Sequence, residues 1–392
     1  MAIGNIAKVY NGNSINAEEK KARYEGLEIG YPFIATKDVG VNGNVDYDNG
    51  VKIPFDTDFK VALPDSVFVC AEGGSAGKKV AHIDRKVCFG NKLFALQPIK
   101  EKVLGSFLFY AVQETGFKTQ FRLLMAGIIG GVSAKKFNSI TIHVPPLSEQ
   151  HRIVSLLDAE FAKIDALKAN AEKNLQNAKD LFQAALKKEL EPKEGWKVKT
   201  LKEIGLTQTG TTPKTSVKEN YGDYIPFIKP ADVNIDGLGN LNYNNEGLSE
   251  QGAKSGRVFD ANSILMVCIG ATIGKVGYAK QKVSSNQQIN VLTPYKGYNS
   301  KFLYYCMASP NFQFKVIKEG ESAKATLPII NKSKWESLLV AIPAIFDQQS
   351  IVSRLDTLNE KCKALQANYE KTLSLCDDLK QALLRKAFNG EI

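Results

Sequence analysis

The feature that most constrains this chain is a long helical pattern that occurs twice. The first copy follows the pair Pro145-Pro146 and continues to about residue 187. Apolar residues recur in it in alternating steps of three and four, from Val154 to Ala185. A heptad repeat of this length is typical of a helix that packs along another helix. The sequence therefore predicts a coiled coil.

The second copy begins near Pro343 and aligns with the first without a gap. The identical pairs include polar as well as apolar positions: Gln150/Gln348, Ile153/Ile351, Leu157/Leu355, Asp158/Asp356, Leu167/Leu365, Asn170/Asn368, Glu172/Glu370 and Asp180/Asp378. Two unrelated surface helices would not share their polar residues. A period of about 200 residues is too long for a solenoid. We therefore expect two copies of a domain, each followed by a long helix.

The heptad seams predict which side chains pair the two helices. In the first copy these are Leu157, Phe161, Ile164, Lys168, Leu175 and Phe182, and in the second they are Leu355, Cys362, Gln366, Tyr369, Leu373 and Leu383. The two polar members, Lys168 and Gln366, align with each other. A single polar residue in such a seam costs stability but can fix the register of the helices.

The chain divides into four predicted parts: a globular domain at 1–144, a helix and linker at 145–193, a second globular domain at 194–342 and a C-terminal helix at 343–392. In the first domain we expect strands at 31–35, 66–71 and 93–96, a loop or hairpin at 37–44, a glycine-rich loop at 72–79 and a helix at 104–113. This mixture indicates an α+β fold with an irregular sheet.

The second globular domain repeats the first weakly. Residues 225–233 resemble 31–39, residues 264–275 resemble the buried strand and glycine loop, and residues 331–335 resemble 133–137. Elsewhere the two domains differ strongly, whereas the two helices remain alike. This contrast indicates that the helices share one task and that the domains have different targets.

Charge and composition narrow the class of protein. The net charge is +10, with a sequence pI of about 9.0, which favours a polyanion as partner, although a lysine-rich surface alone would also explain it. No apolar run approaches the length of a membrane span, and the N-terminus does not resemble a signal peptide. The six cysteines form no CxxC pair. We therefore expect a cytoplasmic protein whose cysteines are buried apolar side chains.

Motifs for catalysis are missing from the sequence. A phosphate-binding loop around Gly77-Lys78 would need glycine where Glu72 stands, and one around Gly274-Lys275 would need glycine at Ile269. The two glycine loops can still contact a DNA phosphate or serve as tight turns. The three histidines have no metal-ligand spacing. We therefore expect a chain that is not an enzyme and that binds no metal or cofactor itself.

The loops are rich in the residue types that contact DNA. Arg, Lys, Asn, Gln, Ser and Thr read base edges in the major groove or hold phosphates. The candidates in the first domain are Thr36, Lys37, Ser75, Lys78, Lys79, Arg85, Lys86, Asn91, Lys92, Ser133, Lys135 and Lys136. Those in the second are Thr207, Gln208, Thr209, Thr211, Thr212, Lys214, Lys229, Thr272, Lys275, Gln287, Gln288, Lys324, Lys332 and Lys334. Each of them is also compatible with an ordinary solvated surface position.

The order of elements resembles the specificity subunits of type I restriction-modification systems: a domain, a long helix, a second domain and a second helix of similar sequence. The most specific resemblance is Pro-Leu-Ser-Glu-Gln-x-x-Ile-Val-x-x-Leu-Asp at residues 146–158, which is echoed at 343–356. The C-terminal segment 379–391 is also similar to that family. The second copy departs from the motif at 344–347.

The resemblance implies two target-recognition domains, each of which reads half of a bipartite site in double-stranded DNA. It also implies that the helices pair as an antiparallel coiled coil and dock two methyltransferase subunits, with two restriction subunits as further possible partners. S-adenosylmethionine and ATP are then expected on the partners. The competing interpretation is a coiled-coil scaffold with two protein-binding domains, and a second rival, an enzyme, lacks its motifs here.

Overall fold

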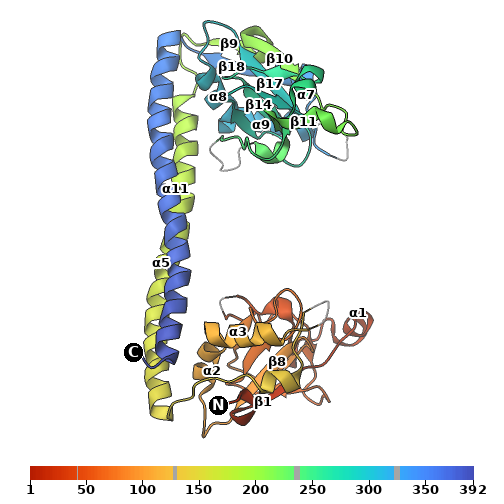
Figure 1. Ribbon diagram of the computed structural model, residues 1–392, viewed down its shortest axis with the longest axis vertical. Coiled ribbons are helices and arrows are strands. Elements are labelled where there is room, and N and C mark those ends of the chain that lie inside the picture. The colour runs from red at the N-terminus through yellow and green to blue at the C-terminus, as the bar shows by residue number, and fades with distance from the viewer. Residues whose placement is uncertain (42, 127–129, 234–238, 322–326) are drawn as a thin grey trace. The chain divides into compact units, whose positions relative to one another are not determined.

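The computed structural model describes residues 1–41, 43–126, 130–233, 239–321 and 327–392. Contacts divide the chain into two compact units, residues 1–170 with 372–392, and residues 171–371. Each unit holds one globular domain and a part of each of two long helices, α5 (Leu147–Glu189) and α11 (Ile345–Phe388) (Figure 1).

The first domain contains two four-stranded sheets and short helices. Its strands are β1 (Ala7–Asn11), β2 (Tyr31–Ile34), β3 (Lys52–Ile53), β4 (Val61–Ala62), β5 (Val67–Cys70), β6 (Val80–His82), β7 (Val87–Phe89) and β8 (Leu93–Pro98). Its helices are η1 (Ile3–Asn5), α1 (Ala17–Glu19), η2 (Lys20–Tyr24), η3 (Thr36–Asp38), α2 (Gly105–Ala111), α3 (Thr115–Leu124) and α4 (Ala134–Asn138). The strands expected at 31–35, 66–71 and 93–96 and the helix expected at 104–113 are confirmed.

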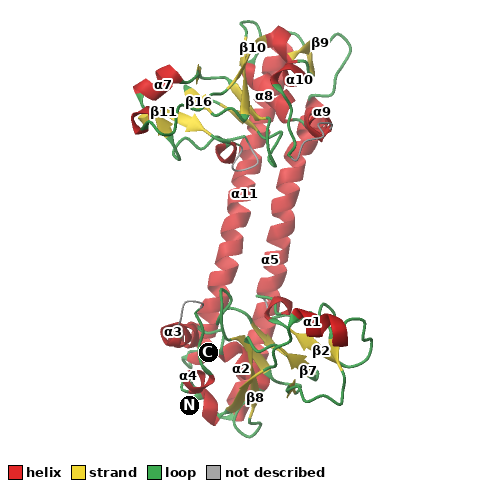
Figure 2. Ribbon diagram, turned by 90° about the vertical axis from the view of Figure 1, so that its right-hand side faces the viewer, coloured by secondary structure: helices red, strands yellow, loops and turns green. Residues whose placement is uncertain are grey.

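The second domain contains β9 (Lys197–Thr200), β10 (Gly205–Thr209), β11 (Tyr221–Ile228), β12 (Gly247–Leu248), β13 (Val258–Phe259), β14 (Ile264–Val267), β15 (Val276–Tyr278), β16 (Val283–Ser285), β17 (Ile289–Pro294) and β18 (Leu339–Ile342). Its helices are α6 (Leu201–Ile204), η4 (Lys218–Asn220), η5 (Pro230–Asp232), α7 (Glu250–Ser255), α8 (Ser300–Ala308), α9 (Pro310–Glu321) and α10 (Lys332–Glu336). Figure 2 shows the strands and short helices of each domain.

The two domains share one sheet topology. The first sheet has the order β1-β8-β5-β6 in one domain and β10-β17-β14-β15 in the other. The second sheet has the order β3-β2-β7-β4 in one and β12-β11-β16-β13 in the other. In both, the central pair of the second sheet is parallel, while its remaining pairs are antiparallel. The weak sequence repeat therefore reflects a shared fold, and the predicted α+β class is confirmed.

The segment after Ile34 differs from the expected loop or hairpin at 37–44. Thr36–Asp38 form a short 3-10 helix, because the Asp38 carboxylate accepts a hydrogen bond from the Ala35 N–H at 2.8 Å and closes the first turn. Val39 and Val45 then form an isolated antiparallel bridge, as a hairpin would. Residue 42 of this segment lies outside the described residues.

The helices α5 and α11 pair in opposite directions within each unit. In the first unit, the Lys168 ammonium lies 2.7 Å from the Asp377 carboxylate, and Lys380 lies 2.5 Å from Asp165. In the second unit, Arg354 contacts Glu189 at 2.6 Å. Residue numbers fall along one helix as they rise along the other, so the pairing is antiparallel. Such exposed ion pairs select the register more than they stabilise it.

Charges at the helix ends agree with the helix dipole. Each long helix has an acidic residue in its first turn, Glu149 or Asp347, and two basic residues in its last turn. Negative charge near the N-terminus and positive charge near the C-terminus stabilise a helix by about 0.3–1 kcal/mol each. The duplicated sequence therefore favours helix formation in both copies independently of the globular domains.

The predicted seam residues lie on the less exposed faces of the helices. Leu157, Ile164, Phe182, Leu355, Cys362 and Gln366 are buried, whereas Phe161, Lys168, Leu175, Tyr369, Leu373 and Leu383 are half-buried. Near the end of α11, Leu384 is buried more fully than Leu383. Lys168 binds Asp377 across the seam, whereas the Gln366 side-chain nitrogen is buried without a hydrogen-bond partner in the described part of the chain.

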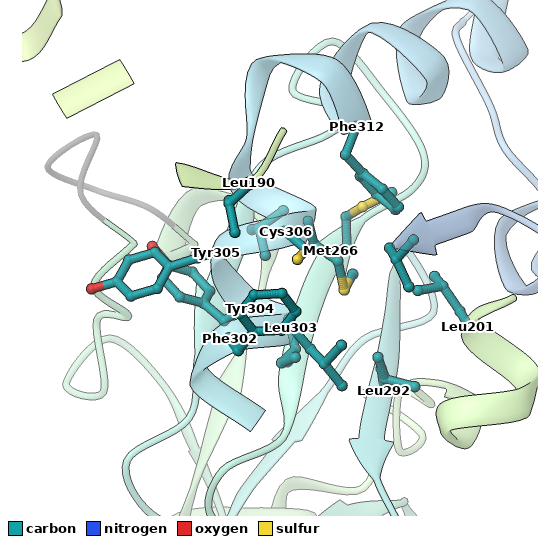
Figure 3. Close-up of a cluster of buried hydrophobic side chains, with 14 of the residues drawn as sticks. Leu190, Leu201, Met266, Leu292, Phe302, Leu303, Tyr304, Tyr305, Cys306 and Phe312 are labelled. Carbon is teal, nitrogen blue, oxygen red and sulfur yellow. The ribbon is translucent and has the colours of Figure 1, made fainter. Parts of the chain in front are cut away.

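The core of each domain continues into both long helices. In the second domain, Phe182 and Leu186 of α5 join the cluster around Phe302–Cys306 of α8. Leu190, directly after α5, belongs to the same cluster (Figure 3). In the first domain, Leu157 of α5 and Leu384 of α11 join the corresponding cluster. Each domain is therefore packed onto the N-terminal part of the helix that follows it and the C-terminal part of the other helix.

All six cysteines are buried free thiols, as expected. Burial raises the pKa of the Cys88 and Cys268 thiols to about 12, so these side chains serve as apolar filling. None of the helices among the described residues is long and apolar enough to cross a membrane.

We expect Leu355→Ala to destabilise the second unit by about 2–5 kcal/mol, because Leu355 is 1% exposed and its loss leaves a cavity in the core shared with α11. Leu365→Ala, on the same helix at a position that is 39% exposed, should cost about 1 kcal/mol or less. Denaturant unfolding followed by tryptophan fluorescence measures both, since Trp196 and Trp335 lie in this unit. Equal losses in the two variants would contradict the assignment of the seam.

Candidate nucleic-acid interface

A buried aspartate holds the same turn at the edge of both domains. Asp38 and Asp232 are 3% and 2% exposed. Each accepts hydrogen bonds from the backbone at the start of its 3-10 helix and from an asparagine side chain, Asn49 or Asn245. A buried carboxylate is tolerated when several donors satisfy it. This brace fixes the backbone that carries the candidates Thr36 and Lys37 in one domain and Lys229 in the other.

The two glycine loops are tight turns, which was one of the two interpretations left open by the sequence. In the first, the N–H groups of Gly73, Ala76, Gly77 and Lys78 all donate to backbone carbonyls. In the second, those of Gly270, Ile273, Gly274 and Lys275 make the matching bonds. These N–H groups are therefore occupied within the protein. A contact of the loops with a DNA phosphate, the other interpretation, stays a prediction.

The candidates of the first domain form two groups. Around the glycine loop, the Lys79 ammonium donates to the Thr36 carbonyl at 3.0 Å, and that of Lys78 donates to Gly74 at 3.1 Å. Asn91 and Lys92 lie together, exposed, in the turn between β7 and β8. The remaining candidates of this domain are placed separately: Ser75 half-buried in the glycine loop, Lys37 exposed on η3, Arg85 and Lys86 exposed before β7, and Ser133, Lys135 and Lys136 exposed at α4.

In the second domain one group of candidates stands out. The Thr212 hydroxyl lies 2.5 Å from the Gln287 amide oxygen, and the Thr209 hydroxyl lies 2.8 Å from that of Asn290. Other candidates in this domain are engaged or placed elsewhere: Thr207 bonds Glu336, Lys229 pairs with Glu246, Lys332 with Glu336 and Lys334 with Glu319. Gln208, Thr211, Lys214, Thr272, Lys275 and Gln288 lie in or beside the strand ends and the second glycine loop. Lys324 lies outside the described residues.

A glutamine of each long helix anchors that helix to its domain. The Gln150 side chain accepts from the Leu104 N–H, at the cap of α2, and donates to the Lys102 and Pro145 carbonyls, all at 2.9 Å. The Gln348 side chain accepts from the Asn299 N–H, at the cap of α8, and donates to Pro343, both at 2.9 Å. Both glutamines are almost completely buried. We call this contact the glutamine anchor.

A tyrosine of each domain reaches the same helix about two turns further along. The Tyr110 hydroxyl lies 2.5 Å from the Asp158 carboxylate, and that of Tyr305 lies 2.5 Å from Asp356. Burial and the neighbouring carboxylate raise the pKa of both phenols well above the usual range, so they stay protonated and donate. Phe161 of α5 packs edge-on against Tyr110 at 5.3 Å between ring centroids.

The sequence analysis missed the roles of these anchors. It recorded Gln150/Gln348 and Asp158/Asp356 as identical pairs but gave them no contact. It did not single out Tyr110 and Tyr305, although Leu108-Phe109-Tyr110-Ala111 and Leu303-Tyr304-Tyr305-Cys306 are similar. The signal was present: polar residues that are identical in both copies of a long helix, such as Gln150/Gln348 and Asp158/Asp356, indicate a shared polar partner.

No group of histidine, cysteine, aspartate and glutamate side chains suited to a metal ion occurs among the described residues. The candidate interface consists of hydrogen-bonding and cationic side chains, many of them on turns. Such a surface can bind and orient a polyanion.

The family model for the type I restriction modification DNA specificity domain matches residues 1–177 and again residues 193–374. The chain therefore belongs to this family and contains its domain twice. It is a specificity subunit of a type I restriction-modification system, with two target-recognition domains. The predicted family and the predicted role as a specificity subunit, not a catalytic one, are confirmed.

Similar proteins include specificity subunits from several organisms. The chain is 30% identical to the type I restriction enzyme HindI specificity subunit of Haemophilus influenzae over half of its length, a match that spans 42% of that subunit. It is 24% identical to the EcoBI specificity subunit of Escherichia coli over its whole length, a match that spans 85% of that protein. The MjaIX specificity subunit of Methanocaldococcus jannaschii is 32% identical over 46% of this chain and 42% of that subunit.

Solved structures share the fold. A chain from work on complex assembly and conformational transition of the type I R-M system aligns with a TM-score of 0.79 and 18% identity, and the alignment covers all of this chain and 97% of that one. The HsdS subunit from Thermoanaerobacter tengcongensis aligns with a TM-score of 0.57 and 19% identity, over all of this chain and 96% of that one.

We expect Gln348→Ala to lower the stability of the second unit by about 1–3 kcal/mol, because the Asn299 N–H and the Pro343 carbonyl lose their buried partner. Gln349→Ala is the matched control, since this neighbouring glutamine is exposed. Denaturant unfolding followed by tryptophan fluorescence compares them. A loss no larger than that of the control would contradict the anchor.

The raised pKa of Tyr305 predicts an alkaline limit to stability. Above about pH 10 the unfolded chain releases the phenol proton while the folded chain keeps it, so stability falls as pH rises, by up to about 1.4 kcal/mol per pH unit from this group. Tyr305→Phe should be less stable at pH 8 but lose less stability between pH 8 and 10.5. Tyr295→Phe, at a half-exposed position, should keep the wild-type slope. An unchanged slope in Tyr305→Phe would overturn the assignment.

Proposed function

We propose that each target-recognition domain of this chain reads one half of a bipartite site in double-stranded DNA. The observation that carries this proposal is the exact repetition of the sheet order and of the glutamine anchor in two domains whose surface side chains differ. One scaffold with two polar surfaces is what two different half-sites require. The net charge of +10 supports a polyanion as the ligand.

The paired helices are proposed to set the distance between the half-sites. An α-helix rises 1.5 Å per residue, so a helix of about 40 residues is about 60 Å long. Because each domain is packed onto both helices, a change in helix length is expected to move the domains apart along the DNA. The length of the helices would therefore determine how many unread base pairs lie between the half-sites, as the distance between subunits does in dimeric DNA-binding proteins.

The duplicated helices are also proposed to dock two methyltransferase subunits. A pseudo-two-fold repeat offers two similar surfaces to two copies of one partner. S-adenosylmethionine is proposed to bind these partners, and ATP two further restriction subunits, so that this chain carries no cofactor of its own. Because the substrate of such a complex is chromosomal DNA, we propose that it is located in the cytoplasm.

The competing proposal is a coiled-coil scaffold with two protein-binding domains. It accounts for the helices equally well. It does not account for the basic charge or for the concentration of base-reading side chain types at strand ends. DNA methylation in a co-expressing cell separates the two, because a scaffold would direct none.

We expect co-expression with a methyltransferase subunit of the same restriction-modification system to add methyladenine to host DNA at a new split motif. Sequencing that detects methylated bases then gives both half-sites and the gap. Methylation without a split motif would contradict the two-domain reading. If neither methylation nor a stable complex with the methyltransferase is detected, the result would favour the scaffold.

A seven-residue insertion at the middle of both helices preserves the heptad seam and adds about 10 Å. We expect the gap in the methylated motif to grow by about three base pairs, at 3.4 Å each, while both half-site sequences stay the same. An altered half-site sequence with the original gap would contradict the role of the helices as a spacer.

A further inference from the structure

In each domain the first sheet is joined to the second at a place where polar side chains gather. In the first domain this place consists of residues 11–13 and 89–92, and in the second of residues 209–212 and 285–288. We call each of them the polar junction. It lies where the edge strand of the first sheet, β1 or β10, ends beside the central strand of the second sheet, β7 or β16.

The backbone of the junction is the same in both domains. The Asn13 N–H donates to the Phe89 carbonyl at 2.9 Å, and at the matching place the Thr211 N–H donates to the Ser285 carbonyl at 2.8 Å. This bond ties the two sheets together in each domain. The side chains on either side of it are therefore presented on a fixed frame, as precise recognition requires.

A glycine at the centre of each junction makes this frame rigid. A Cβ atom placed on Gly12 would lie 1.9 Å from the Phe89 carbonyl oxygen, and one on Gly210 would lie 2.2 Å from that of Asn286. No side chain fits at such a distance, so the two backbones can approach only through glycine. Both domains use the same device at the same place.

The side chains on this common frame differ between the domains. At matched positions the first junction carries Asn11, Asn13 and Asn91, and the second carries Thr209, Thr211 and Gln287. All of these are types that read base edges. Asn91 and Gln287 are exposed. A shared backbone with different amide and hydroxyl groups is the arrangement expected where two related domains read different bases.

The second junction also holds polar atoms that the protein does not satisfy. The Thr211 and Ser285 hydroxyls are buried without a hydrogen-bond partner among the described residues, and Ser285 is 0% exposed. Buried polar groups are normally paired. Thr211 is only half-buried and lies near the exposed Gln287, so a ligand at this surface can complete its hydrogen bond, whereas Ser285 lies fully inside the domain.

A cation stands at the same position beside both junctions. Lys60 precedes β4 and Arg257 precedes β13, and both are exposed. The Lys60 backbone N–H donates to the Asn13 side-chain oxygen at 2.8 Å, which places Lys60 next to the first junction, and the Arg257 guanidinium donates to the Thr209 carbonyl. Basic residues beside base-reading groups are suited to hold the neighbouring phosphate.

We infer that the polar junctions are the specificity-determining contacts of the two domains: Asn91 in the first and Thr211 with Gln287 in the second read base edges, while Lys60 and Arg257 hold phosphate. This inference rests on the proposed reading of a bipartite site. It selects a few residues from the many candidates of the sequence, and it adds Lys60 and Arg257, which the sequence analysis did not name.

The test uses the chain in complex with its methyltransferase subunits and a library of DNA duplexes that vary every base of both half-sites. We expect Gln287→Ala and Thr211→Val to relax the preference at one or two base pairs of one half-site by about 5- to 150-fold, the range of a lost base contact. Asn91→Ala should do the same in the other half-site only. Arg257→Gln should weaken methylation of all sequences alike and reduce its salt dependence.

Gln251→Ala and Asn5→Ala are matched controls, because both side chains are exposed in the same two domains away from the junctions. They should leave both half-sites unchanged. Wild-type preferences in Gln287→Ala, Thr211→Val and Asn91→Ala would overturn the inference, as would a uniform loss in all three, which would assign the junctions to phosphate contact or to folding. Absence of a split motif with the wild-type complex would instead overturn the proposed function itself.

Discussion

The structure depends on the way each globular domain is fixed to the helix pair. The glutamine anchor joins Gln150 or Gln348 to the cap of the domain's own helix, and a tyrosine bonds the same long helix about two turns further on. Apolar side chains of both long helices complete each domain's core. Polar groups give this attachment its geometry, since buried hydrogen bonds are directional, and apolar burial gives it most of its stability.

This attachment explains why the helices and the domains have diverged differently. A helix residue that serves a domain core, the partner helix and a buried hydrogen bond at once cannot change without a loss in each. The strand ends and turns of the domains share a backbone frame, as at Gly12 and Gly210, and different side-chain hydrogen bonds are built on it in the two domains. Their side chains are free to differ. At matched positions of these strand ends and turns, the first domain has asparagine where the second has threonine or glutamine.

Much of the architecture could be predicted because it depends on local pattern. The heptad seam, the ungapped repeat and the turn chemistry identify two long helices and two similar domains, and several strand positions follow from short apolar runs. The candidate site was harder. Lysines such as Lys229, Lys332 and Lys334 satisfied the same residue-type rule as Gln287, yet each pairs with a carboxylate of its own domain. Residue type alone does not reveal such pairing.

The sequence by itself determined the duplication, the class of fold and the family, because these depend on periodicity and on residues that repeat at a constant spacing. Only the tertiary structure decided which polar residues anchor the domains and which gather at the junctions. The packing of sheets and helices brings together residues that are distant in the sequence, such as Tyr110 with Asp158 and Asn13 with Phe89. Contacts of this kind follow from the path of the whole backbone, which no local pattern encodes.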